Sequence, residues 1–290
     1  MQDPIDKTAA LVQAHEYIRC FAGKVIVVKI GGSTMDEADT LSNVLSDVCF
    51  MAAVGMCPIV VHGGGKEITA AMQKAGLKAR FLQGRRYTDE QTLVLAEQVL
   101  VNQVNSRINR LISKLGHKAM GLHSLSSCVV FAKRLRLDQE CGPQLDLGFV
   151  GEVEWVNAEL LHALTETGCI PVIAPIARDA AGGKLNVNAD LIGGHVAAAT
   201  RAEKLVLVSD THGIRRSNEE DDLASHLTKD DVKKLVELGV IRSGMLPKVE
   251  ACLLALEAGV PKAHIVDGRI PHSVLLEVYT DKGIGTEIVL

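Results

Sequence analysis

The stretch VIVVKIGGS, residues 25–33, carries an apolar, β-branched run directly into a glycine-rich turn. The stretch PIVVHGGG, residues 58–65, repeats this arrangement, and similar apolar runs occupy residues 170–174 and 205–208. Runs without polar alternation are typical of strands that are buried on both faces. The four runs therefore predict strands of one buried, parallel sheet.

Apolar residues recur at helical spacing between these runs. They form two stripes, one of Leu41, Val44, Leu45, Val48 and Met51 and one of Leu93, Ala96, Val99, Leu100 and Val104. Such stripes are typical of helices that cover a sheet. The alternation of strand, turn and helix predicts an α/β fold with an open, mostly parallel sheet between two layers of helices, a three-layer αβα unit.

Composition narrows the class of protein. The chain has 290 residues, 31 Lys or Arg against 35 Asp or Glu, and a formal charge of −4, which argues against a nucleic-acid or membrane-surface partner. The length fits two domains or one two-lobed unit. Seven scattered cysteines without a C-x-x-C pair, a polar N-terminus and the lack of a long apolar run predict a soluble, cytoplasmic protein.

Two segments lie outside the alternation of strands and helices. Residues 1–23 predict a leading helix, capped by Asp3 and with Pro4 in its first turn, whose apolar face packs on its own domain or on another subunit. Residues 133–148 alternate and contain turn residues, which predicts a hairpin. Residues 182–183 and 217–222 are expected to be surface loops.

The two glycine-rich turns are candidate anion sites. Gly31, Gly32, Gly63 and Gly64 each follow a predicted strand, where N–H groups without a nearby Cβ can bind a phosphate or a carboxylate. Either turn alone is better explained as an ordinary strand-to-helix turn. Two such turns at one edge of a parallel sheet favour a ligand site, because ligands of open α/β folds bind at that edge.

Polar residues at three further places could serve the same site. Lys29 ends an apolar strand and is either a snorkelling residue or a cation directed at the ligand. Lys248 opens an apolar helix and could instead be a solvated first-turn residue. Asn186, Asn188 and Asp190 precede a helix rich in Ala and Gly, where Asx residues usually act as caps.

Five motifs in this order resemble the amino-acid kinase family. They are KIGG at residues 29–32, VHGGG at 61–65, NVNAD at 186–190, LVSDTHGI at 207–214 and GMLPK at 244–248. DLGFVGEV at residues 146–153 is similar to the N-acetylglutamate kinases of that family. The resemblance implies a kinase domain over residues 24–268, an N-lobe of residues 24–175 that binds substrate and dimerises, and a C-lobe of residues 176–290 that binds ATP and ends in a helix and strand at 269–290.

The resemblance also implies an activity, the ATP-dependent phosphorylation of the side-chain carboxylate of N-acetyl-L-glutamate, with Mg²⁺ on the ATP phosphates and no metal site of the protein itself. Lys29 and Lys248 would flank the transferred phosphoryl group, Asp190 would hold both lysines, and the four glycines would donate N–H groups to phosphate. Gly63, Gly64, Arg86 and Asn186 would bind the amino-acid substrate. The nucleotide would contact Ser209, Asp210, Gly213, Ile214, Gly244 and Met245.

The two ends of the chain resemble the arginine-inhibited members of the family, in which a leading helix joins dimers into a hexamer. The implied effector residues are Tyr17, His272, Glu277, Gly283 and Gly285. The alternative is a C-terminal amphipathic helix followed by an edge strand, with His272 only as a cap. A homodimer or a hexamer made of three dimers is expected, and a nitrogen-signalling protein partner stays unassigned.

The chain departs from the family pattern at several positions. Residues 121–126, GLHSLS, lose a glycine and an acid beside the implied substrate lobe, and Lys66, Arg85, His212 and Ser243 replace the usual residues. These departures leave two alternatives, a paralogue that phosphorylates another amino-acid carboxylate or a carbamate, and an effector-binding protein that has lost turnover.

Overall fold

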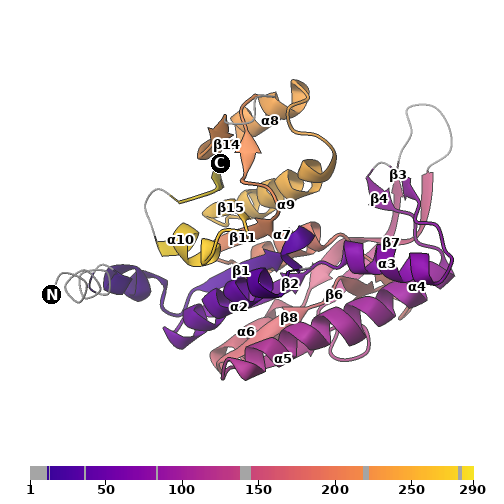
Figure 1. The fold of residues 1–290 in the computed structure, drawn as a ribbon, viewed down its shortest axis with the longest axis horizontal. Coiled ribbons are helices and arrows are strands. Elements are labelled where there is room, and N and C mark those ends of the chain that lie inside the picture. The colour runs from indigo at the N-terminus through magenta and orange to yellow at the C-terminus, as the bar shows by residue number, and fades with distance from the viewer. Residues whose placement is uncertain are drawn as a thin grey trace.

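The apolar runs form the centre of an eight-stranded sheet, in the order β14-β16-β15-β11-β1-β2-β8-β5 (Figure 1). The computed structural model describes residues 12, 14–35, 37–82, 84–137, 145–217, 222–279 and 283–290. All neighbouring strands are parallel except β15 and β16, which confirms the expected open, mostly parallel sheet. The strands are β1 Val25–Ile30, β2 Cys57–His62, β5 Lys118–Leu122, β8 Cys169–Ile173, β11 Lys204–Ser209, β14 His226–Thr228, β15 Lys262–Asp267 and β16 Thr286–Val289.

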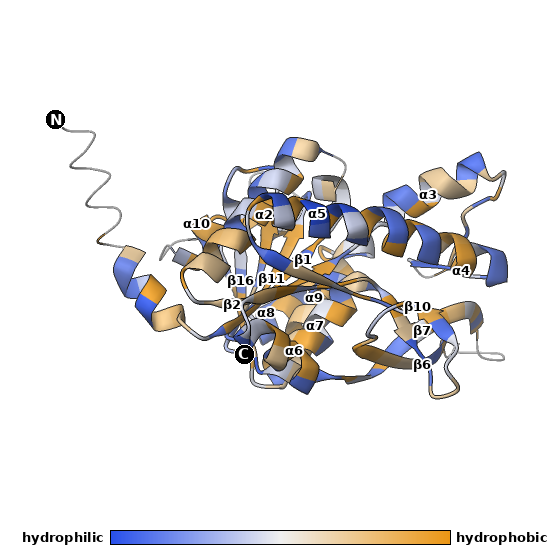
Figure 2. Ribbon diagram, turned by 90° about the horizontal axis from the view of Figure 1, so that it is seen from below, coloured by the Kyte–Doolittle hydropathy of each residue, from blue (hydrophilic) through white to orange (hydrophobic). Residues whose placement is uncertain are grey.

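Helices cover both faces of this sheet, as the αβα prediction requires (Figure 2). One face packs against α2 Ala38–Ala53, α3 Gly65–Lys74, α4 Glu90–Glu97, the π-helix η2 Gln98–Asn105, α5 Ser106–Lys114 and α10 Ser273–Tyr279. The other face packs against α6 Ala158–Glu166, α7 Ala189–Thr200, α8 Lys229–Glu237 and α9 Leu246–Glu257. Short 3₁₀ turns lie at η1 Gly32–Met35 and η3 Ser243–Met245.

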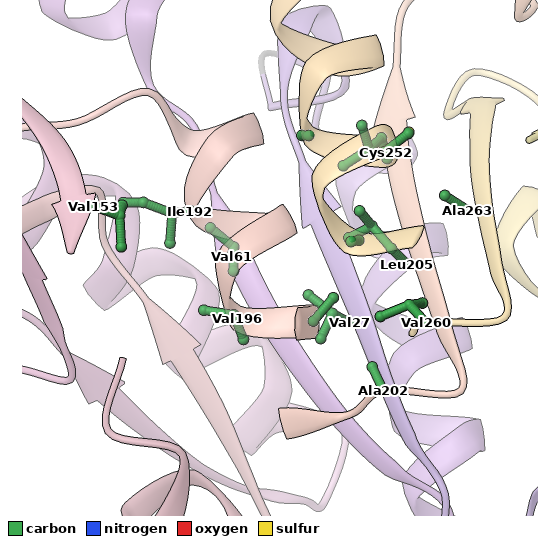
Figure 3. Packing of buried hydrophobic residues seen from close by; sticks show 14 of the residues in the cluster. Val27, Val61, Val153, Ile192, Val196, Ala202, Leu205, Cys252, Val260 and Ala263 are labelled. Carbon is green, nitrogen blue, oxygen red and sulfur yellow. The ribbon is translucent and has the colours of Figure 1, made fainter. Parts of the chain in front are cut away.

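Strand β1 shows how the side chains divide between the two cores. Val25 and Val27 belong to the cluster under α7 and α9, part of which is drawn in Figure 3, whereas Ile26 and Val28 belong to the cluster under α2. Successive side chains of a strand point to opposite faces. Lys29 therefore lies on the α7 side of the sheet.

A second, smaller sheet lies beside the main one. Strands β10 Lys184–Asn186, β7 Leu145–Val156, β6 Val130–Leu137 and β9 Ile176–Arg178 pair into a closed ring. The antiparallel pairing of β6 and β7 confirms the hairpin expected at residues 133–148, although residues 138–144 lie outside the described part. Two short ladders pair β3 Phe81–Leu82 with β4 Arg85–Arg86 and β12 Ile214–Arg215 with β13 Leu223–Ala224.

The ends of the chain follow the predictions only in part. Residues 14–21 are helical, while the capping residues Asp3 and Pro4 lie outside the described residues. The helix and strand expected at residues 269–290 are present as α10 and β16. The alternative that this strand is an edge strand is wrong, because β16 is hydrogen-bonded on both sides, to β15 and to β14. None of the described helices has the length and apolarity needed to cross a membrane.

Candidate active site

Lys29 meets the first turn of α7 at the end of β1. Asn188 caps α7 by accepting hydrogen bonds from the N–H groups of Asp190 and Leu191, as the cap interpretation predicts. Asp190 is the second residue of α7, and its carboxylate lies 2.6 Å from Lys29 Nζ. Only 5% of the Lys29 side chain and 7% of the Asp190 side chain are exposed, so the ion pair is almost dry.

Lys248 reaches the same carboxylate from α9. The helices α7 and α9 approach closely because Gly194 has no Cβ, and a Cβ there would lie 2.6 Å from the Ala251 carbonyl oxygen. Near this contact, in the first turn of each helix, Lys248 Nζ lies 3.0 Å from Asp190 Oδ2. Two lysines from distant parts of the sequence thus share one carboxylate.

The protonation of this trio follows from its burial and its charges. Burial raises the pKa of Asp190, but the ammonium groups of Lys29 and Lys248 more than offset it and hold that pKa below its ordinary value. Burial also lowers the pKa of Lys29, against the attraction of Asp190. The arrangement is one buried anion between two cations, which leaves net positive charge for a ligand.

The glycine turns offer fewer free N–H groups than expected. The N–H of Gly31 bonds to the Val208 carbonyl at 3.2 Å, and that of Gly63 bonds to the Ile30 carbonyl at 2.7 Å. Within the described residues, the N–H groups of Gly32 and Gly64 have no such partner, because each begins a helix whose first N–H groups lack acceptors. The expectation that all four glycines donate therefore needs correction: Gly32 and Gly64 are the available donors.

Gly31 has a different role in the turn. An added Cβ would lie 2.1 Å from Lys29 Nζ, so the missing side chain makes room for the ammonium group. Gly64 is restricted in another way, since it has a φ of 156° and a Cβ there would lie 2.5 Å from Leu100 Cδ2.

A cavity of about 250 Å³ lies over these turns. Its wall includes Lys29, Asp190 and the residues that the sequence assigned to the amino-acid substrate, namely Gly63, Gly64, Arg86 and Asn186. Arg86 donates to the Gly65 carbonyl and to Thr69 Oγ1 at the start of α3, and its guanidinium lies 4.8 Å from the centre of the Phe81 ring. Asn186 donates to Thr88 Oγ1.

A larger cavity of about 1120 Å³ adjoins Lys248. Its wall contains all six residues expected at the nucleotide, Ser209, Asp210, Gly213, Ile214, Gly244 and Met245. The volume suits a nucleotide, while the smaller cavity suits a small acid. Lys248 faces the large cavity and its partners Lys29 and Asp190 face the small one, so the ion-paired trio joins the two walls.

Sequence reasoning missed three arginines in the large cavity. Arg215, Arg242 and Arg269 all contribute to its wall. Asp267, at the end of β15, accepts from Arg269 Nε at 2.9 Å and from its Nη2 at 2.6 Å, and His212 Nδ1 lies 2.9 Å from the same carboxylate. The sequence contained a signal for Arg269: Asp267 and Arg269 stand at the end of an apolar run, as Lys29 and Gly31 do.

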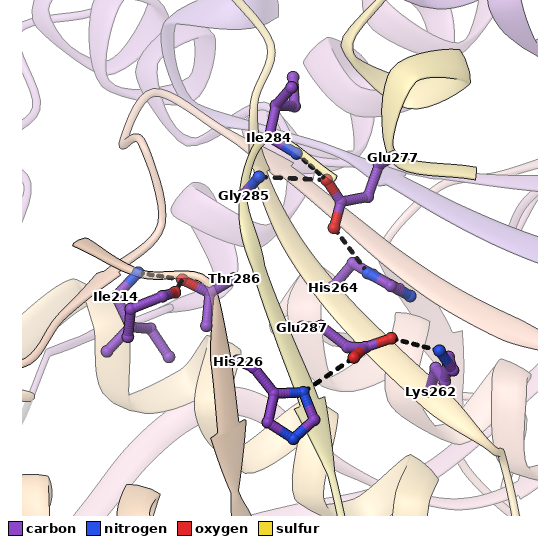
Figure 4. Close-up of polar contacts among 10 residues, drawn as sticks. Ile214, His226, Lys262, His264, Glu277, Ile284, Gly285, Thr286 and Glu287 are labelled. Atoms are coloured by element: carbon purple, nitrogen blue, oxygen red, sulfur yellow. Dashed lines mark hydrogen bonds and ion pairs between the residues drawn. The ribbon is translucent and has the colours of Figure 1, made fainter. Parts of the chain in front are cut away.

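The expected effector residues are divided between two places. Tyr17, Glu277 and Gly283 line a third cavity of about 710 Å³ between the leading helix and the C-terminal strands. Gly285 instead donates its N–H to Glu277, which also accepts from Ile284 and pairs with His264 (Figure 4). His272 is not among the residues that line this cavity; its Nδ1 lies 2.7 Å from the buried Asp47.

The departure at residues 121–126 lies away from both ligand cavities. Of the described residues that line the small cavity, none comes from this segment. Ser124 Oγ instead hydrogen-bonds to Glu97, and Arg178 donates to the Ser124 carbonyl. The segment therefore does not line the small cavity; the Ser124 hydroxyl ties it to α4 and the Ser124 carbonyl ties it to β9.

Comparison with known proteins agrees with this architecture. Residues 24–267 match the model of the amino acid kinase family, and the chain belongs to that family. The acetylglutamate kinase of Symbiobacterium thermophilum is 44% identical over 290 residues, covering 99% of each chain. That of Heliobacterium modesticaldum is 45% identical over 294 residues and covers both chains completely.

Solved structures show the same fold at lower identity. The N-acetylglutamate synthase from Neisseria gonorrhoeae, complexed with coenzyme A and N-acetyl-glutamate, superposes with a TM-score of 0.86 at 24% identity, over 98% of this chain and 63% of that one. The carbamate kinase from Giardia lamblia bound to AMP-PNP gives a TM-score of 0.66 at 13% identity, over 92% of this chain and 99% of that one.

Proposed function

We propose that this chain transfers the terminal phosphoryl group of ATP to the side-chain carboxylate of N-acetyl-L-glutamate, which yields ADP and an acyl phosphate for arginine biosynthesis. The observation that carries the proposal is the convergence of Lys29 and Lys248 on Asp190, between a small cavity and a nucleotide-sized one. Full-length identity of 44–45% to acetylglutamate kinases supports the choice of acceptor.

The chemistry needs cations more than it needs a base. The acceptor carboxylate, with an ordinary pKa of about 4.3, is already ionised near neutral pH. The obstacle is the repulsion between this anion and the phosphates of ATP, followed by charge on the phosphoryl oxygens in a loose transition state. Lys29 and Lys248 supply the positive charge, the N–H groups of Gly32 and Gly64 supply fixed donors, and Asp190 is a positioning residue for both lysines.

The two cavities divide the substrates between them. In the small one, the guanidinium of Arg86 matches the fork of an α-carboxylate and Asn186 contributes an amide beside it. In the large one, Lys248, Arg242 and Arg269 provide the cationic side for the phosphates of ATP. Mg²⁺ would be held by phosphate oxygens, and across the described residues no cluster of three or more His, Cys, Asp or Glu side chains could hold it alone.

The proposed lobes meet at the small cavity, to which residues 186–190 of the second lobe also contribute. We assign residues 24–175 to the amino-acid side and to dimer formation, residues 176–290 to the nucleotide side, and residues 1–23 to assembly. The exposed edge strand β5, with Met120 42% exposed, is consistent with a homodimer through the first of these units.

The test is ADP release with a panel of acceptors. N-acetylglutamate, glutamate, aspartate and N-acetyl-aminoadipate are compared at saturating ATP and Mg²⁺. Turnover with N-acetylglutamate in clear preference supports the proposal. Preference for another acceptor indicates a paralogue, and no turnover with any acceptor alongside tight arginine binding indicates an effector-binding protein.

A second function, inhibition by arginine, is supported by the third cavity. Its wall places the carboxylates of Glu203, Glu277 and Glu287 and Tyr17 of the leading helix beside the basic residues Lys204, Lys262, His226 and His264. Glu287 pairs with Lys262 and Glu277 pairs with His264, so arginine would bind here by competing with these cations for the carboxylates. Tyr17 and Phe21 line the cavity and stack edge-on against Tyr279, so a ligand there would contact the leading helix directly. Removal of residues 1–21 should leave dimers and weaken inhibition by arginine; unchanged inhibition would show that the helix only packs.

A further inference from the structure

His62 lies immediately before the glycines of the second turn and has no exposed surface. It does not line either ligand cavity within the described residues. Its Nδ1 lies 2.7 Å from the Gly63 carbonyl oxygen, and its Nε2 lies 3.1 Å from Asn105 Nδ2. Both ring nitrogens are therefore engaged by protein groups, the Gly63 carbonyl and the Asn105 amide.

These contacts specify a single tautomer of the ring. A carbonyl oxygen only accepts hydrogen bonds, so Nδ1 must carry a proton to bond to Gly63. Asn105 Nδ2 donates to the Val172 carbonyl at 2.9 Å and directs its second hydrogen at His62 Nε2, which must then accept. Asn109 fixes the amide in this orientation by donating to Asn105 Oδ1 at 2.8 Å. Burial lowers the pKa of His62 to about 4, which keeps the ring neutral.

The Gly63 carbonyl belongs to the same peptide unit as the N–H of Gly64. Every described peptide bond is trans, and in a trans peptide the C=O and the N–H point in opposite directions. Because the carbonyl is directed at the buried His62 ring, the N–H of Gly64 is directed away from it, on the side where Gly64 lines the small cavity.

We propose that His62 is a positioning residue for phosphoryl transfer: its Nδ1–H holds the Gly63 carbonyl, and the shared peptide plane thereby directs the N–H of Gly64 at the transferring phosphate. Asn105 acts through His62, since its amide selects the tautomer in which Nδ1 can donate. We call this chain of contacts, from Asn105 through His62 to the peptide unit of Gly63 and Gly64, the relay. The inference rests on the proposed kinase function.

The residues around His62 and Asn105 leave room for these hydrogen bonds. Asn105 is the last residue of the π-helix η2, a type of helix often found at functional sites, and its amide contacts both β2 and β8, at His62 and at the Val172 carbonyl. A Cβ on Gly121 of β5 would lie 2.2 Å from Asn105 Oδ1, so a glycine is required there. The same π-helix packs Leu100 against Gly64, which fixes the other side of the peptide unit.

The test compares variants that break the relay at different points. His62→Phe removes the donor, His62→Asn keeps an N–H donor near the Nδ1 position, and Gly121→Ala pushes Asn105 aside without touching His62. Thr200→Val is the matched control, because it also loses one buried hydrogen bond, to the Val196 carbonyl within α7. For each variant, kcat, KM, the melting temperature and the ¹⁵N–¹H resonance of Gly64 are measured.

We expect kcat of His62→Phe and Gly121→Ala to fall about 10- to 100-fold, less than the ~10²–10³-fold for a deleted oxyanion donor, with KM within about threefold. His62→Asn should recover most of kcat, and Thr200→Val should keep it. The Gly64 amide resonance of ligand-free protein should shift in His62→Phe and Gly121→Ala and stay in the control.

Three results would overturn the relay. The first is a Gly64 resonance that stays in place in His62→Phe. The second is a loss of kcat in Thr200→Val equal to that in His62→Phe, and the third is a ¹⁵N spectrum that places the proton of His62 on Nε2. Failure of the kinase proposal gives a different result. Wild-type protein would then release no ADP, while the shift of the Gly64 amide resonance in His62→Phe would still report the relay.

Discussion

Replacing Gly31 by Ala separates the placement of Lys29 from the stability of the fold. The added Cβ would lie 2.1 Å from Lys29 Nζ and 2.9 Å from its Cε, while its third-nearest neighbour, Lys29 Cδ, is 3.8 Å away. Gly31 has no positive φ, so its backbone accepts an alanine. The overlap is thus confined to the end of one flexible side chain, which can move.

The size of the effect follows from this overlap. Ordinary contact requires the ammonium group to retreat by roughly 1 Å, and a shift of that size in a catalytic group can cost about 10²-fold in rate. The retreat also lengthens the 2.6 Å ion pair with Asp190. We expect kcat to fall about 100-fold, or ~2.7 kcal/mol of barrier, while the free energy of unfolding changes by less than ~1 kcal/mol.

The assay is initial-rate ADP release at saturating substrates, paired with urea unfolding. Gly65→Ala is the matched comparison, because a Cβ there meets no atom within 4 Å. It should keep kcat within about threefold of the wild type, since it displaces no cation. Wild-type kcat in a folded Gly31→Ala protein would refute the reasoning, and so would a loss of rate no greater than that of Gly65→Ala.

Further predictions concern single groups of the site. Lys248→Ala should lower kcat about 10²–10³-fold with a smaller effect on the melting temperature; parallel losses would mean a structural lysine. Arg86→Lys should raise KM for the amino acid about tenfold, since an ammonium cannot reproduce the guanidinium fork, and an unchanged KM would exclude it from the pocket. Asp267→Asn should raise KM for ATP several-fold by releasing Arg269, as fluorescence titration of a nucleotide analogue would show; unchanged affinity contradicts this role. His62 has an ordinary pKa of 6.5 and a folded value of about 4, so the unfolded chain binds more protons between these values. Stability should then fall by up to roughly 3 kcal/mol as pH drops from 6.5 to 4, with a slope that urea unfolding finds reduced in His62→Asn.

Local patterns in the sequence predicted most of the elements that carry the site. The apolar run at residues 25–28 and the cap Asn188 act through their immediate neighbours, and both occur as expected. Local patterns left open the alternative of an edge strand at the C-terminus, because the second partner of β16, β14, lies far from it in the sequence. The contacts of the segment at residues 121–126 were also beyond local patterns, since nothing in its own sequence shows that Ser124 bonds to Glu97.

By itself, the sequence determined the layers of the fold, the two glycine turns and the two candidate lysines, because side-chain periodicity and turn chemistry are local properties. Only the tertiary structure decided that Lys29 and Lys248 share the carboxylate of Asp190, which depends on the close approach of α7 and α9 at Gly194. It also decided which glycine N–H groups are free, since those of Gly31 and Gly63 donate hydrogen bonds to carbonyls of neighbouring strands. Hydrogen-bond partners and buried charges are set by distances between segments that are remote along the chain, and a one-dimensional pattern does not contain those distances.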